Sequence, residues 1–498
     1  MTLAQSHIEH ERGFALHRQG LVKEAEPFYR AALSLDPDCK EAWMNLGLTA
    51  FTLGRRDEAQ ACQREALRLD PDTPDAHNNL GMIHYSQGRL AEAENCFRAA
   101  LRLAPGHANA TLNLGSVRQL GGHVEEAEAL FRHALALGVD PVHANSNLAL
   151  ALMEQVRPAE AELCCREALA INPRSAEARA NLALALLTQG RLEEGWQAYE
   201  SRWEVEAMSD PAPALPQPRW TGQALHGETV LLYAEQGFGD TLQFCRYAPM
   251  VAAAGGRVVL VVPKLLRRLM TTLDGVADLL TEEDGPLPPF DYHCPLLSLP
   301  FAFDTKMATI PAPATYLRAD ADAWADVLDP LPGLRIGLVW AGKSRTAQPH
   351  AAAIDKRRSM RLADMAPLFS VPGCSFVSLQ LGPPARQMQA PPPGAVLHDV
   401  AHRLDDWADT ADLIMGLDLV IAVDTAVAHL AGALGKPVWM LSRFDACWRW
   451  FLDRDDTPWY PSMRIFRQTS RGDWAGVIEQ VRQALEREAV AATSSCPA

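Results

Sequence analysis

A period of 34 residues runs through the first 200 residues and restricts the fold more than any other feature of this sequence. Alanine, proline, asparagine and glycine recur at this step. Val156 takes one place in the glycine series, whose members are Gly20, Gly54, Gly88, Gly122 and Gly190. Glycine accepts the left-handed backbone conformation that ends a helix, and proline stops the helix that follows. Because one helical hairpin cannot bury its apolar face alone, the period predicts an α-solenoid of stacked hairpins.

The segment EAWMNLGLTAFTLGRRDEAQACQREALRLDP, residues 41–71, resembles the tetratricopeptide repeat at almost every signature position. Six such repeats are predicted over residues 6–203, beginning near Ser6, Lys40, Pro74, Ala108, Val142 and Ala176. The resemblance implies a curved solenoid whose concave face binds a peptide or a protein segment.

One asparagine per repeat forms a ladder, whose members are Asn45, Asn79, Asn113, Asn147 and Asn181. The ladder resembles the one in O-linked N-acetylglucosamine transferase, a family that uses asparagine side chains to hold the backbone of the acceptor peptide. An amide offers a donor and an acceptor, which suits an extended chain of any sequence. Two interpretations stay open: these side chains bind an acceptor peptide, or each one bonds a neighbouring helix.

The length and the charge of the chain limit its class. Its 498 residues are too many for one hydrophobic core, so we expect two or three domains. The formal charge of -15 comes from 61 acidic and 46 basic residues. This balance argues against binding to nucleic acid or to an anionic membrane surface.

The sequence also predicts the compartment. No apolar run approaches the roughly 20 residues that a membrane-spanning helix needs, and the first residues lack the pattern of a signal peptide. We therefore expect a cytoplasmic protein without membrane insertion, whose ten cysteines stay reduced. No cluster of histidine and cysteine has zinc spacing, so no metal site is predicted.

The period ends after Trp203, and the rest of the chain has a different organisation. A proline-rich linker is predicted over residues 204–227. Two α/β units are predicted over residues 228–320 and 333–490, because apolar strands alternate there with helical segments. The last residues, 491–498, are predicted to form a disordered tail.

In the first α/β unit, the strand 228–235 is followed by a tight turn that contains Gln236, Gly237 and Gly239. A glycine turn between strand and helix places backbone N–H groups at the crevice above the strand ends, where open α/β sheets bind ligands. Asp240 ends the turn and has two interpretations that do not exclude each other. It is a cap of the following helix, or a general base that faces the cleft.

In the second α/β unit, the strand 334–340 is followed by a basic polar loop over residues 343–361. One acidic residue, Asp355, opposes six basic ones, which are Lys343, Arg345, Lys356, Arg357, Arg358 and Arg361. Such a concentration of positive charge in an acidic chain favours an anion, and a diphosphate fits best. The alternative is a mobile loop whose charges are solvated.

The stretch VDTAVAHLAGALGKPV, residues 423–438, is predicted to be a strand end, a turn and a helix of small residues. Thr425 and Ala426 at the start of the helix offer free N–H groups and the positive end of the helix dipole to a phosphate. His429 lies four residues beyond Thr425 and therefore on the same helix face. In the alternative interpretation, Thr425 is only a cap and His429 is a packed histidine.

An aromatic cluster follows the last predicted strand, and its members are Trp448, Trp450, Trp459 and Tyr460. Aromatic rings stack on a nucleotide base or a sugar, and they also fill hydrophobic cores. Both a ligand-stacking role and a packed hydrophobic plug therefore stay open for this cluster.

Four motifs resemble the glycosyltransferase-9 superfamily, which includes the heptosyltransferases, and its bacterial branch in which tetratricopeptide repeats precede the enzyme. They are EQGFGDTLQFCRY, GLVWAGK, FVSLQ and DLVIAVDTAVAHLAGALGKPVW. The resemblance covers residues 228–490 and implies a GT-B fold of two Rossmann-like halves, with the donor nucleotide on the C-terminal half. It also implies an inverting transfer from a nucleotide-sugar donor, without a catalytic metal or another cofactor.

The same resemblance implies roles for single residues. The presumed base of the family falls on Asp240. The implied diphosphate-binding residues are Asp424, Thr425, Ala426 and His429, with a basic contact at Lys343 or within Lys356–Arg358.

These observations together predict a cytoplasmic glycosyltransferase that moves a sugar from a nucleotide sugar to a protein acceptor presented by the repeats. Flagellin or another surface protein fits the acceptor, by analogy with similar repeat–transferase proteins. Two alternatives stay open. The same chemistry acts on a saccharide or lipid-linked acceptor, or the chain is a non-catalytic scaffold that binds a nucleotide sugar.

Overall fold

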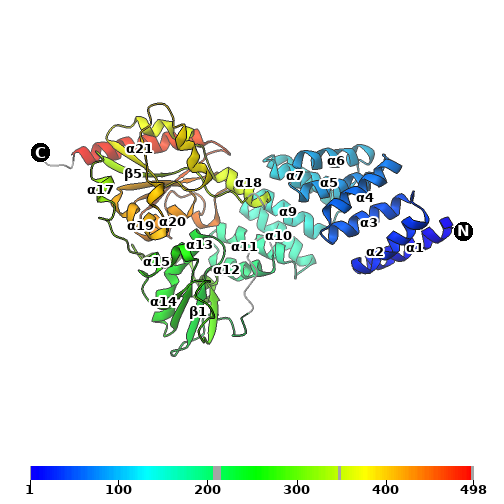
Figure 1. Cartoon of the computed structure of the whole chain (residues 1–498), viewed down its shortest axis with the longest axis horizontal. Coiled ribbons are helices and arrows are strands. Elements are labelled where there is room, and N and C mark those ends of the chain that lie inside the picture. Colours follow the sequence, from blue (N-terminus) through cyan, green and yellow to red (C-terminus); the bar gives the residue numbers. More distant parts are fainter. Residues whose placement is uncertain (1, 206–214, 346–348, 495–498) are drawn as a thin grey trace. The chain divides into compact units, whose positions relative to one another are not determined.

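The structure, a computed structural model, describes residues 2–205, 215–345 and 349–494 (Figure 1). Its contacts divide the chain into two units, Met1–Pro173 and Arg174–Ala498, which we describe separately. The sixth predicted hairpin therefore groups with the α/β part of the chain, one repeat earlier than the end of the sequence period.

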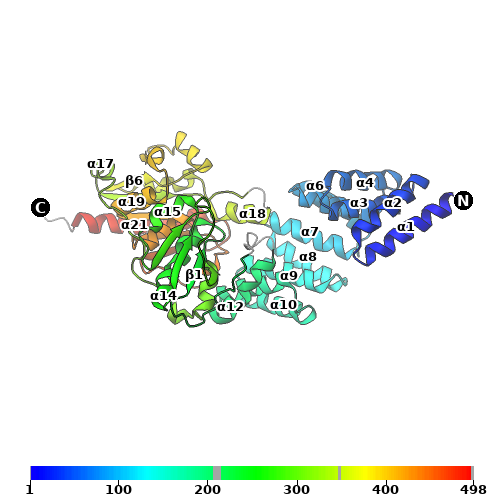
Figure 2. The same cartoon turned by 60° about the horizontal axis from the view of Figure 1, so that its bottom comes forward.

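The first unit consists of five helical hairpins, as the sequence period predicts (Figure 2). The helices are α1 (Thr2–Arg18), α2 (Val22–Leu35), α3 (Lys40–Thr52), α4 (Arg56–Leu69), α5 (Pro74–Ser86), α6 (Leu90–Leu103), α7 (Ala108–Leu120), α8 (Val124–Ala136), α9 (Pro141–Glu154) and α10 (Pro158–Ile171). The sixth hairpin, α11 (Ala176–Thr188) and α12 (Leu192–Tyr199), belongs to the second unit.

In the third and fourth hairpins, a bulky aromatic side chain lies against a glycine of the first helix. A Cβ atom at Gly81 would lie 2.5 Å from the ring of Phe97, and one at Gly115 would lie 2.6 Å from the ring of Phe131. Both rings are buried. Gly81 and Gly115 thus permit close approach of the two helices of their hairpins, a role distinct from that of the turn glycines.

The turn glycines adopt the left-handed conformation that their series predicts, and Val156 adopts it as well. The φ angles of Gly88 and Gly122 are 72° and 86°, and that of Val156 is 59°. A β-branched residue is strained in this region because its Cβ atom crowds the backbone. Backbone hydrogen bonds from the N–H groups of Val156 and Arg157 to the carbonyls of Met153 and Leu152, at 3.0 and 2.9 Å, form this turn although valine avoids the conformation.

The second unit contains two parallel sheets. The first has the order β3-β2-β1-β4 and the second the order β10-β9-β8-β5-β6-β7. The strands are β1 (Thr229–Tyr233), β2 (Arg257–Val261), β3 (Val276–Leu280), β4 (Tyr292–Pro295), β5 (Leu334–Val339), β6 (Cys374–Ser378), β7 (Leu397–Asp399), β8 (Leu419–Val423), β9 (Val438–Ser442) and β10 (Met463–Arg467). The prediction of an α/β fold with parallel strands is confirmed.

Helices connect these strands and cover the sheets. They are α13 (Phe238–Phe244), α14 (Ala248–Ala253), α15 (Arg267–Met270), α16 (Leu299–Ala302), α17 (Ala325–Leu328), α18 (Pro349–Arg358), α19 (Trp407–Gly416), α20 (Ala426–Ala433) and α21 (Trp474–Ser494).

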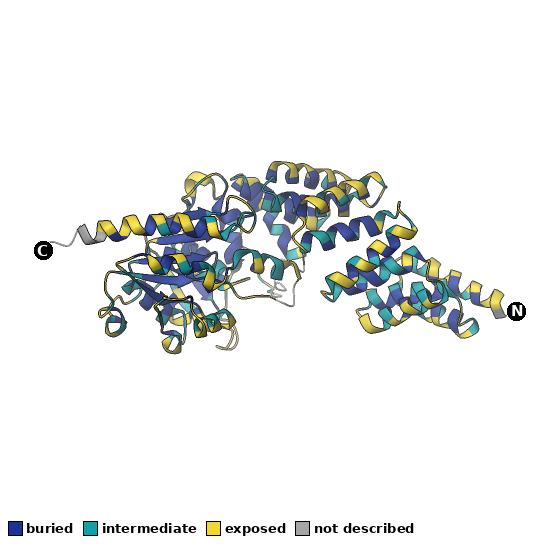
Figure 3. Cartoon of the chain, turned by 90° about the horizontal axis from the view of Figure 1, so that it is seen from above, coloured by how far each residue is buried: buried dark blue, intermediate teal, exposed yellow. Residues whose placement is uncertain are grey.

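Both faces of the second sheet are buried. In β8, Val420 and Ala422 join the core that also contains the first sheet, whereas Ile421 and Val423 join a second core beneath α21. This alternation follows from the period of two in a strand, and it explains why β8 is apolar throughout. In Figure 3 the strands are accordingly dark blue, while exposed residues line the outer side of the helix that ends at C.

Two segments differ from their sequence-based predictions. Residues 349–358 form α18, where a polar loop was expected, and α21 extends to Ser494, so residues 491–494 are helical rather than part of a disordered tail. Residues 495–498 of that tail and 206–214 of the linker lie outside the described residues. The rest of the linker packs on the first sheet, because the Trp220 side chain is buried and its backbone N–H donates to the His293 carbonyl at 2.8 Å.

We predict that Val156→Gly raises the free energy of unfolding by about 1 kcal/mol, because glycine accepts positive φ without strain. The reverse change at an equivalent turn, Gly122→Val, tests the same backbone effect with the opposite sign. No described atom lies within 4 Å of a Cβ at Gly122, so a side chain there meets space and only the backbone is strained. Urea unfolding followed by circular dichroism measures both. Destabilisation by Val156→Gly would show that the valine side chain contributes more than its strain costs.

Candidate functional site at the carboxyl edges of the two sheets

The second sheet is wound in opposite directions from β5. Numbered along the chain, its strands have the order 3-2-1-4-5-6, so the chain turns to one side from β5 to β6 and returns to the other side at β8. Open α/β sheets bind ligands beyond the strand ends at such a switch point. Residues 340–343 follow β5 and residues 424–426 follow β8, so the predicted residues Lys343, Asp424, Thr425 and Ala426 leave the sheet at its carboxyl edge.

Arg358 connects these two strand ends. Its Nη1 donates to the backbone carbonyl of Asp424 at 3.2 Å. Its guanidinium also lies against Gly342, where a Cβ atom would be 2.8 Å from Nε. That Nε is buried and has no hydrogen-bond partner among the residues that the structure describes. The structure thus brings together Arg358 from the basic segment and Asp424 from the strand–turn–helix motif.

Most of the basic segment is neutralised by carboxylates. The buried Asp355 accepts from Arg345 at 3.0 Å and from Arg358 at 2.7 Å. Arg357 pairs with Asp445 at 3.0 Å, and Arg361 with Asp364 at 2.7 Å. Four of the six basic side chains of this segment are therefore paired with carboxylates in the structure.

Lys343 and Lys356 differ from these arginines because both are exposed and neither forms an ion pair with any residue in the described ranges. They and the partly engaged Arg358 are the cations that this edge offers to an anion.

Gln380 holds the end of β5 and was not singled out in the sequence. Its Oε1 accepts from the backbone N–H groups of Trp340 and Ala341 at 3.1 and 2.8 Å, and its Nε2 donates to the Ala341 carbonyl at 3.0 Å. Residues 340–341 lie beyond the end of β5, where no neighbouring strand in the described part of the chain supplies hydrogen bonds to their backbone. Gln380 supplies these bonds instead and so holds the backbone that leads to Lys343. Its position at the end of the motif FVSLQ was the available signal.

Thr425 is the N-cap residue of α20, but its side chain makes no capping hydrogen bond. Its Oγ1 is buried and has no hydrogen-bond partner in the described part of the chain. A buried hydroxyl without a partner is costly. The capping interpretation therefore holds for the backbone of Thr425 and not for its side chain, whose hydroxyl makes no bond to the described residues.

His429 lies inside the protein among aromatic rings. Its ring stacks on Trp450 with centroids 5.3 Å apart, and its Nδ1 lies 2.9 Å from Tyr460 Oη. Burial lowers the pKa of His429 to about 4, so the ring is neutral near pH 7. The structure agrees with the packed-histidine interpretation and gives no cationic phosphate ligand at this position.

The small residues at the start of α20 allow close contact with α13. A Cβ atom at Gly239 would lie 3.4 Å from the Ala426 Cα and 3.0 Å from His429 Cδ2. The first turns of the two helices, which follow β1 and β8, therefore meet through backbone atoms. Tight packing accounts for at least part of the small-residue pattern that also suits a bound phosphate.

Asp240 is engaged twice. Its Oδ2 accepts from the backbone N–H of Gly237 at 3.0 Å, and its Oδ1 accepts from Arg449 Nη2. The N-cap residue of α13 is Gly237, and Asp240 is the third helical residue, which bonds back to it. The prediction that Asp240 itself is the N-cap is thus wrong in position, although its carboxylate does satisfy a free N–H at the helix start.

Arg449 orients the Asp240 carboxylate and was not recognised from the sequence. It is buried, donates through Nε to Gln243 Oε1 at 2.7 Å, and lies 4.3 Å above the Trp448 ring. Gln236, at the start of the turn, is exposed and has a φ of 61°. No sequence signal links Arg449 to Asp240, because 209 residues separate them.

The aromatic cluster is a packed plug. Its rings are buried, and Trp448 makes an edge contact at 5.2 Å with Trp196 of α12. Trp459 also lies against Trp196, at 6.3 Å. Of the two interpretations left open by the sequence, the structure supports packing over stacking on a ligand, because each of the four rings is 5% exposed or less.

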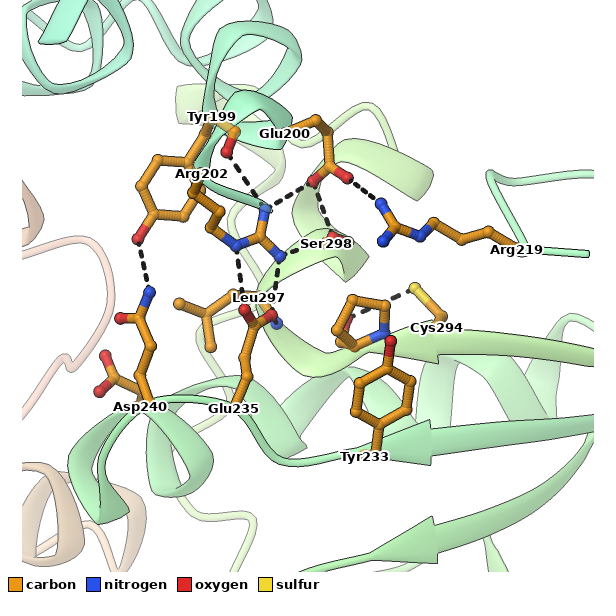
Figure 4. A network of polar contacts seen from close by, with 12 residues as sticks. Tyr199, Glu200, Arg202, Arg219, Tyr233, Glu235, Asp240, Cys294, Leu297 and Ser298 are labelled. Atoms are coloured by element: carbon orange, nitrogen blue, oxygen red, sulfur yellow. Dashed lines mark hydrogen bonds and ion pairs between the residues drawn. The ribbon is translucent and has the colours of Figure 1, made fainter. Parts of the chain in front are cut away.

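A buried ion pair lies at the carboxyl edge of the first sheet (Figure 4). Arg202, in the 3-10 helix η1 (Glu200–Glu204), donates to both oxygens of Glu235 at 2.9 and 2.7 Å. It also donates to Ser298 Oγ at 2.8 Å. Glu235 follows β1 and Ser298 follows β4, so Arg202 lies at the switch point of this sheet. The guanidinium of Arg202 therefore occupies the position at which such sheets bind ligands.

The asparagine ladder lies on α3, α5, α7, α9 and α11, the first helices of their hairpins. Two of its members bond a neighbouring helix: Asn45 Nδ2 lies 2.9 Å from His10 Nε2, and Asn113 Nδ2 donates to Asn78 Oδ1 at 2.9 Å. Asn181 is buried. For these members the structure supports the structural interpretation.

Asn79 has different surroundings because it borders a small groove between α3 and α5. The other residues that line the groove are Gly47, Leu48, Phe51, Gln63, Met82 and Ile83. Asn147 is half-buried, and its side chain forms no hydrogen bond with the residues that the structure describes. These two members keep amide groups that can reach a peptide.

Two broader expectations from the sequence also have structural counterparts. In the part of the chain that the structure describes, no helix is both long enough and apolar enough to cross a membrane. Nine cysteines in that part are free thiols.

Comparisons with known proteins match the repeats to two family models. Residues 13–162 match the C-terminal domain of cilia and flagella-associated protein 70, and residues 146–211 match the tetratricopeptide repeat. Among curated proteins, Protein FlbA of Caulobacter vibrioides is 29% identical over 327 residues, which cover 59% of this chain and 52% of FlbA. The match thus spans about half the length of that relative.

Two solved structures are among those similar to part of this chain. The Pseudomonas aeruginosa protein pilF has a TM-score of 0.35 and 20% identity, over 41% of this chain and 91% of its own. TTC0263, a tetratricopeptide-repeat protein of Thermus thermophilus, has a TM-score of 0.33 and 26% identity, over 36% and 99%. With the 34-residue period and the observed hairpins, the family matches identify the helical repeats of this chain as tetratricopeptide repeats.

Proposed function

We propose that this chain is a glycosyltransferase of the GT-B type, which transfers a sugar from a nucleotide sugar to a protein bound by its repeats. One observation carries the proposal: the second sheet has the strand order of a nucleotide-binding sheet, and Arg358 bonds Asp424 at its switch point. The next residue, Thr425, has a hydroxyl without a partner among the described residues. The first sheet, with its own switch point, would form the acceptor half.

The donor diphosphate would lie at the start of α20. The free N–H groups of Ala426 and Val427 and the positive end of the helix dipole favour an anion there. Lys343, Lys356 and Arg358 would add charge. The hydroxyl of Thr425 and the Nε of Arg358 lack partners among the described residues, so phosphate oxygens would satisfy both groups.

Asp240 would act as the general base. In an inverting transfer, the acceptor oxygen forms a bond to the anomeric carbon while the bond to the diphosphate breaks. The carboxylate takes the acceptor proton, and the nucleoside diphosphate leaves with the negative charge that the cations and the helix stabilise. The side chain of Asp240 is 21% exposed, so an acceptor hydroxyl can approach it.

The acceptor would be an extended polypeptide on the inner helices of the repeats. Asn79 and Asn147 would bond its backbone. A surface protein such as flagellin remains our proposal for the acceptor, and a saccharide or lipid-linked acceptor is the alternative.

A scaffold that binds a nucleotide sugar without turnover is a second candidate. One observation favours it: both oxygens of Asp240 already accept hydrogen bonds, from Arg449 and from Gly237. Such engagement leaves fewer lone pairs for an acceptor proton.

Donor binding predicts a thermal shift. Uridine, adenosine and guanosine diphosphates are each added to the full chain, and the one that binds should stabilise it by about 2.7 kcal/mol at 100 times its dissociation constant. Thr425→Glu should abolish the shift, because it places negative charge where phosphate lies. Thr52→Glu adds the same charge at an exposed site of the first unit and serves as the control. Equal shifts in both variants would place the nucleotide elsewhere.

The role of Asp240 separates the enzyme from the scaffold. Asp240→Asn keeps an oxygen that can accept from Gly237 but removes the proton acceptor, so transfer should fall at least about 100-fold while diphosphate binding persists. The control Asp278→Asn makes the same change in a more exposed, arginine-paired carboxylate on β3. Release of nucleoside diphosphate from a panel of nucleotide sugars measures both. Transfer by Asp240→Asn within a few-fold of the unaltered chain would exclude it as the base.

Acceptor binding predicts that the double variant Asn79→Ala, Asn147→Ala captures its protein acceptor less well. Each lost hydrogen bond is worth on the order of 1 kcal/mol, or about fivefold in affinity. Asn109→Ala, at an exposed residue outside the ladder, should have no effect. The dissociation constant for the acceptor, measured by calorimetry, distinguishes the variants, and an unchanged value in the double variant would leave the ladder a purely structural role.

A further inference from the structure

We propose that His7, His10 and Glu11, on the first helix of the repeats, form a binding site for a divalent transition-metal ion such as Zn²⁺. One potential ligand atom from each residue lies within 4.8 Å of the other two. The site lies in the first unit and is independent of the proposed glycosyl transfer.

The spacing of the three residues places them on one face of α1. Residues three and four apart are neighbours on a helix surface, which describes the positions of His10 and Glu11 relative to His7. Neutral imidazole and carboxylate are both ligands of zinc. A set of two histidines and one carboxylate leaves further coordination positions for water or another ligand.

The distance between His10 and Glu11 already suits a metal. Their Nδ1 and Oε1 atoms are 3.4 Å apart. Two ligands at about 2.1 Å from a tetrahedral zinc ion are also about 3.4 Å apart, from the geometry of the tetrahedron. His7 is exposed, so its ring is free to turn toward the other two.

The ring of His10 is held in the orientation that a ligand needs. It is 8% exposed and packs against Tyr29, with centroids 5.9 Å apart. The side-chain amide of Asn45, on α3, lies 2.9 Å from its Nε2. The two ends of an amide are assigned from hydrogen bonding. The structure places the Asn45 amide nitrogen toward Nε2, so coordination through Nδ1 needs the amide turned over. Its oxygen would then accept from Nε2–H, and the lone pair of Nδ1 would face Glu11.

This contact from Asn45 has the form of the outer interactions that orient histidine ligands. Metal-bound histidines donate their second N–H to an acceptor, which fixes the tautomer and the ring. A bound ion would thus connect α1, through His10 and Asn45, to the next repeat. Zinc spacing rules based on paired cysteines and histidines miss the site because all three ligands lie within five residues of one helix.

The test uses the full chain without a purification tag. It is treated with a chelator, dialysed and titrated with zinc chloride in a calorimeter. We expect the unaltered chain to bind one more zinc ion than His7→Ala, His10→Ala. Glu11→Gln should weaken this site at least about tenfold, and Asn45→Ala about 10- to 100-fold. His143→Ala removes an exposed histidine of another repeat and should bind zinc as the unaltered chain does.

Circular dichroism verifies that each variant is folded, and Glu11→Gln keeps the proposal testable if the histidine double variant is not. The same number and affinity of zinc ions in the unaltered chain and in His7→Ala, His10→Ala would overturn the proposal, because thiols elsewhere would then hold the metal. Wild-type affinity in Glu11→Gln and Asn45→Ala together would overturn it as well.

Discussion

The buried ion pair between Arg202 and Glu235 is the interaction on which the second unit depends. Burial raises the pKa of Glu235, and the hydrogen bonds from Arg202 oppose that change. Two charges out of water are tolerated only when their donors and acceptors are satisfied, and removal of one partner from such a pair costs about 3–5 kcal/mol. Arg202 meets this requirement with further bonds to Glu200 and Ser298. The pair therefore ties the last repeat to the strand ends of the first sheet.

This interaction has a consequence for the organisation of the chain. The sixth hairpin has the sequence of a repeat but lies in the same contact unit as the two sheets. Trp196 of α12 packs beside Trp448 and Trp459, which come from the end of the second α/β unit. A repeat that contributes both a buried charge and an aromatic core to the α/β part is a structural member of that part. The repeats therefore end after Trp203 in the sequence, whereas the first packed unit ends at Pro173.

The site itself shows one set of residues in two physical roles. Gly239 and Ala426 let α13 and α20 meet through backbone atoms, and Ala426 has no side chain that could bond the N–H groups at the start of α20. Asp240 satisfies a helix N–H and also accepts from Arg449. Close packing and ligand binding make the same demand on these residues. Their small size therefore does not distinguish the two roles.

Local physical chemistry made much of the fold predictable. The repeats follow from a period in which each hairpin buries its apolar face against the next one, and β1 and β5 lie within the predicted strands 228–235 and 334–340. The strand β8 and the helix α20 follow from an apolar run that ends at Asp424. The prediction of a polar loop in the basic segment was wrong for residues 349–358, which form a helix. The helix α18 contains the buried Asp355, which pairs with Arg345 and Arg358. These ion pairs could not be predicted from the periodicity of the sequence.

The sequence by itself determined the elements whose stability is local or repeated: the hairpins, most of the parallel strands, and the turns at Gly237 and Thr425. Only the tertiary structure decided which side chains meet across long separations. Arg449 reaches Asp240 over 209 residues, and Arg202 reaches Glu235 over 33. Such pairs are set by strand order and by the desolvation of charges in a shared core, neither of which is a property of neighbouring residues. For the same reason the burial of His429 and of the tryptophan plug became evident only when the sheets and the last repeat were seen together.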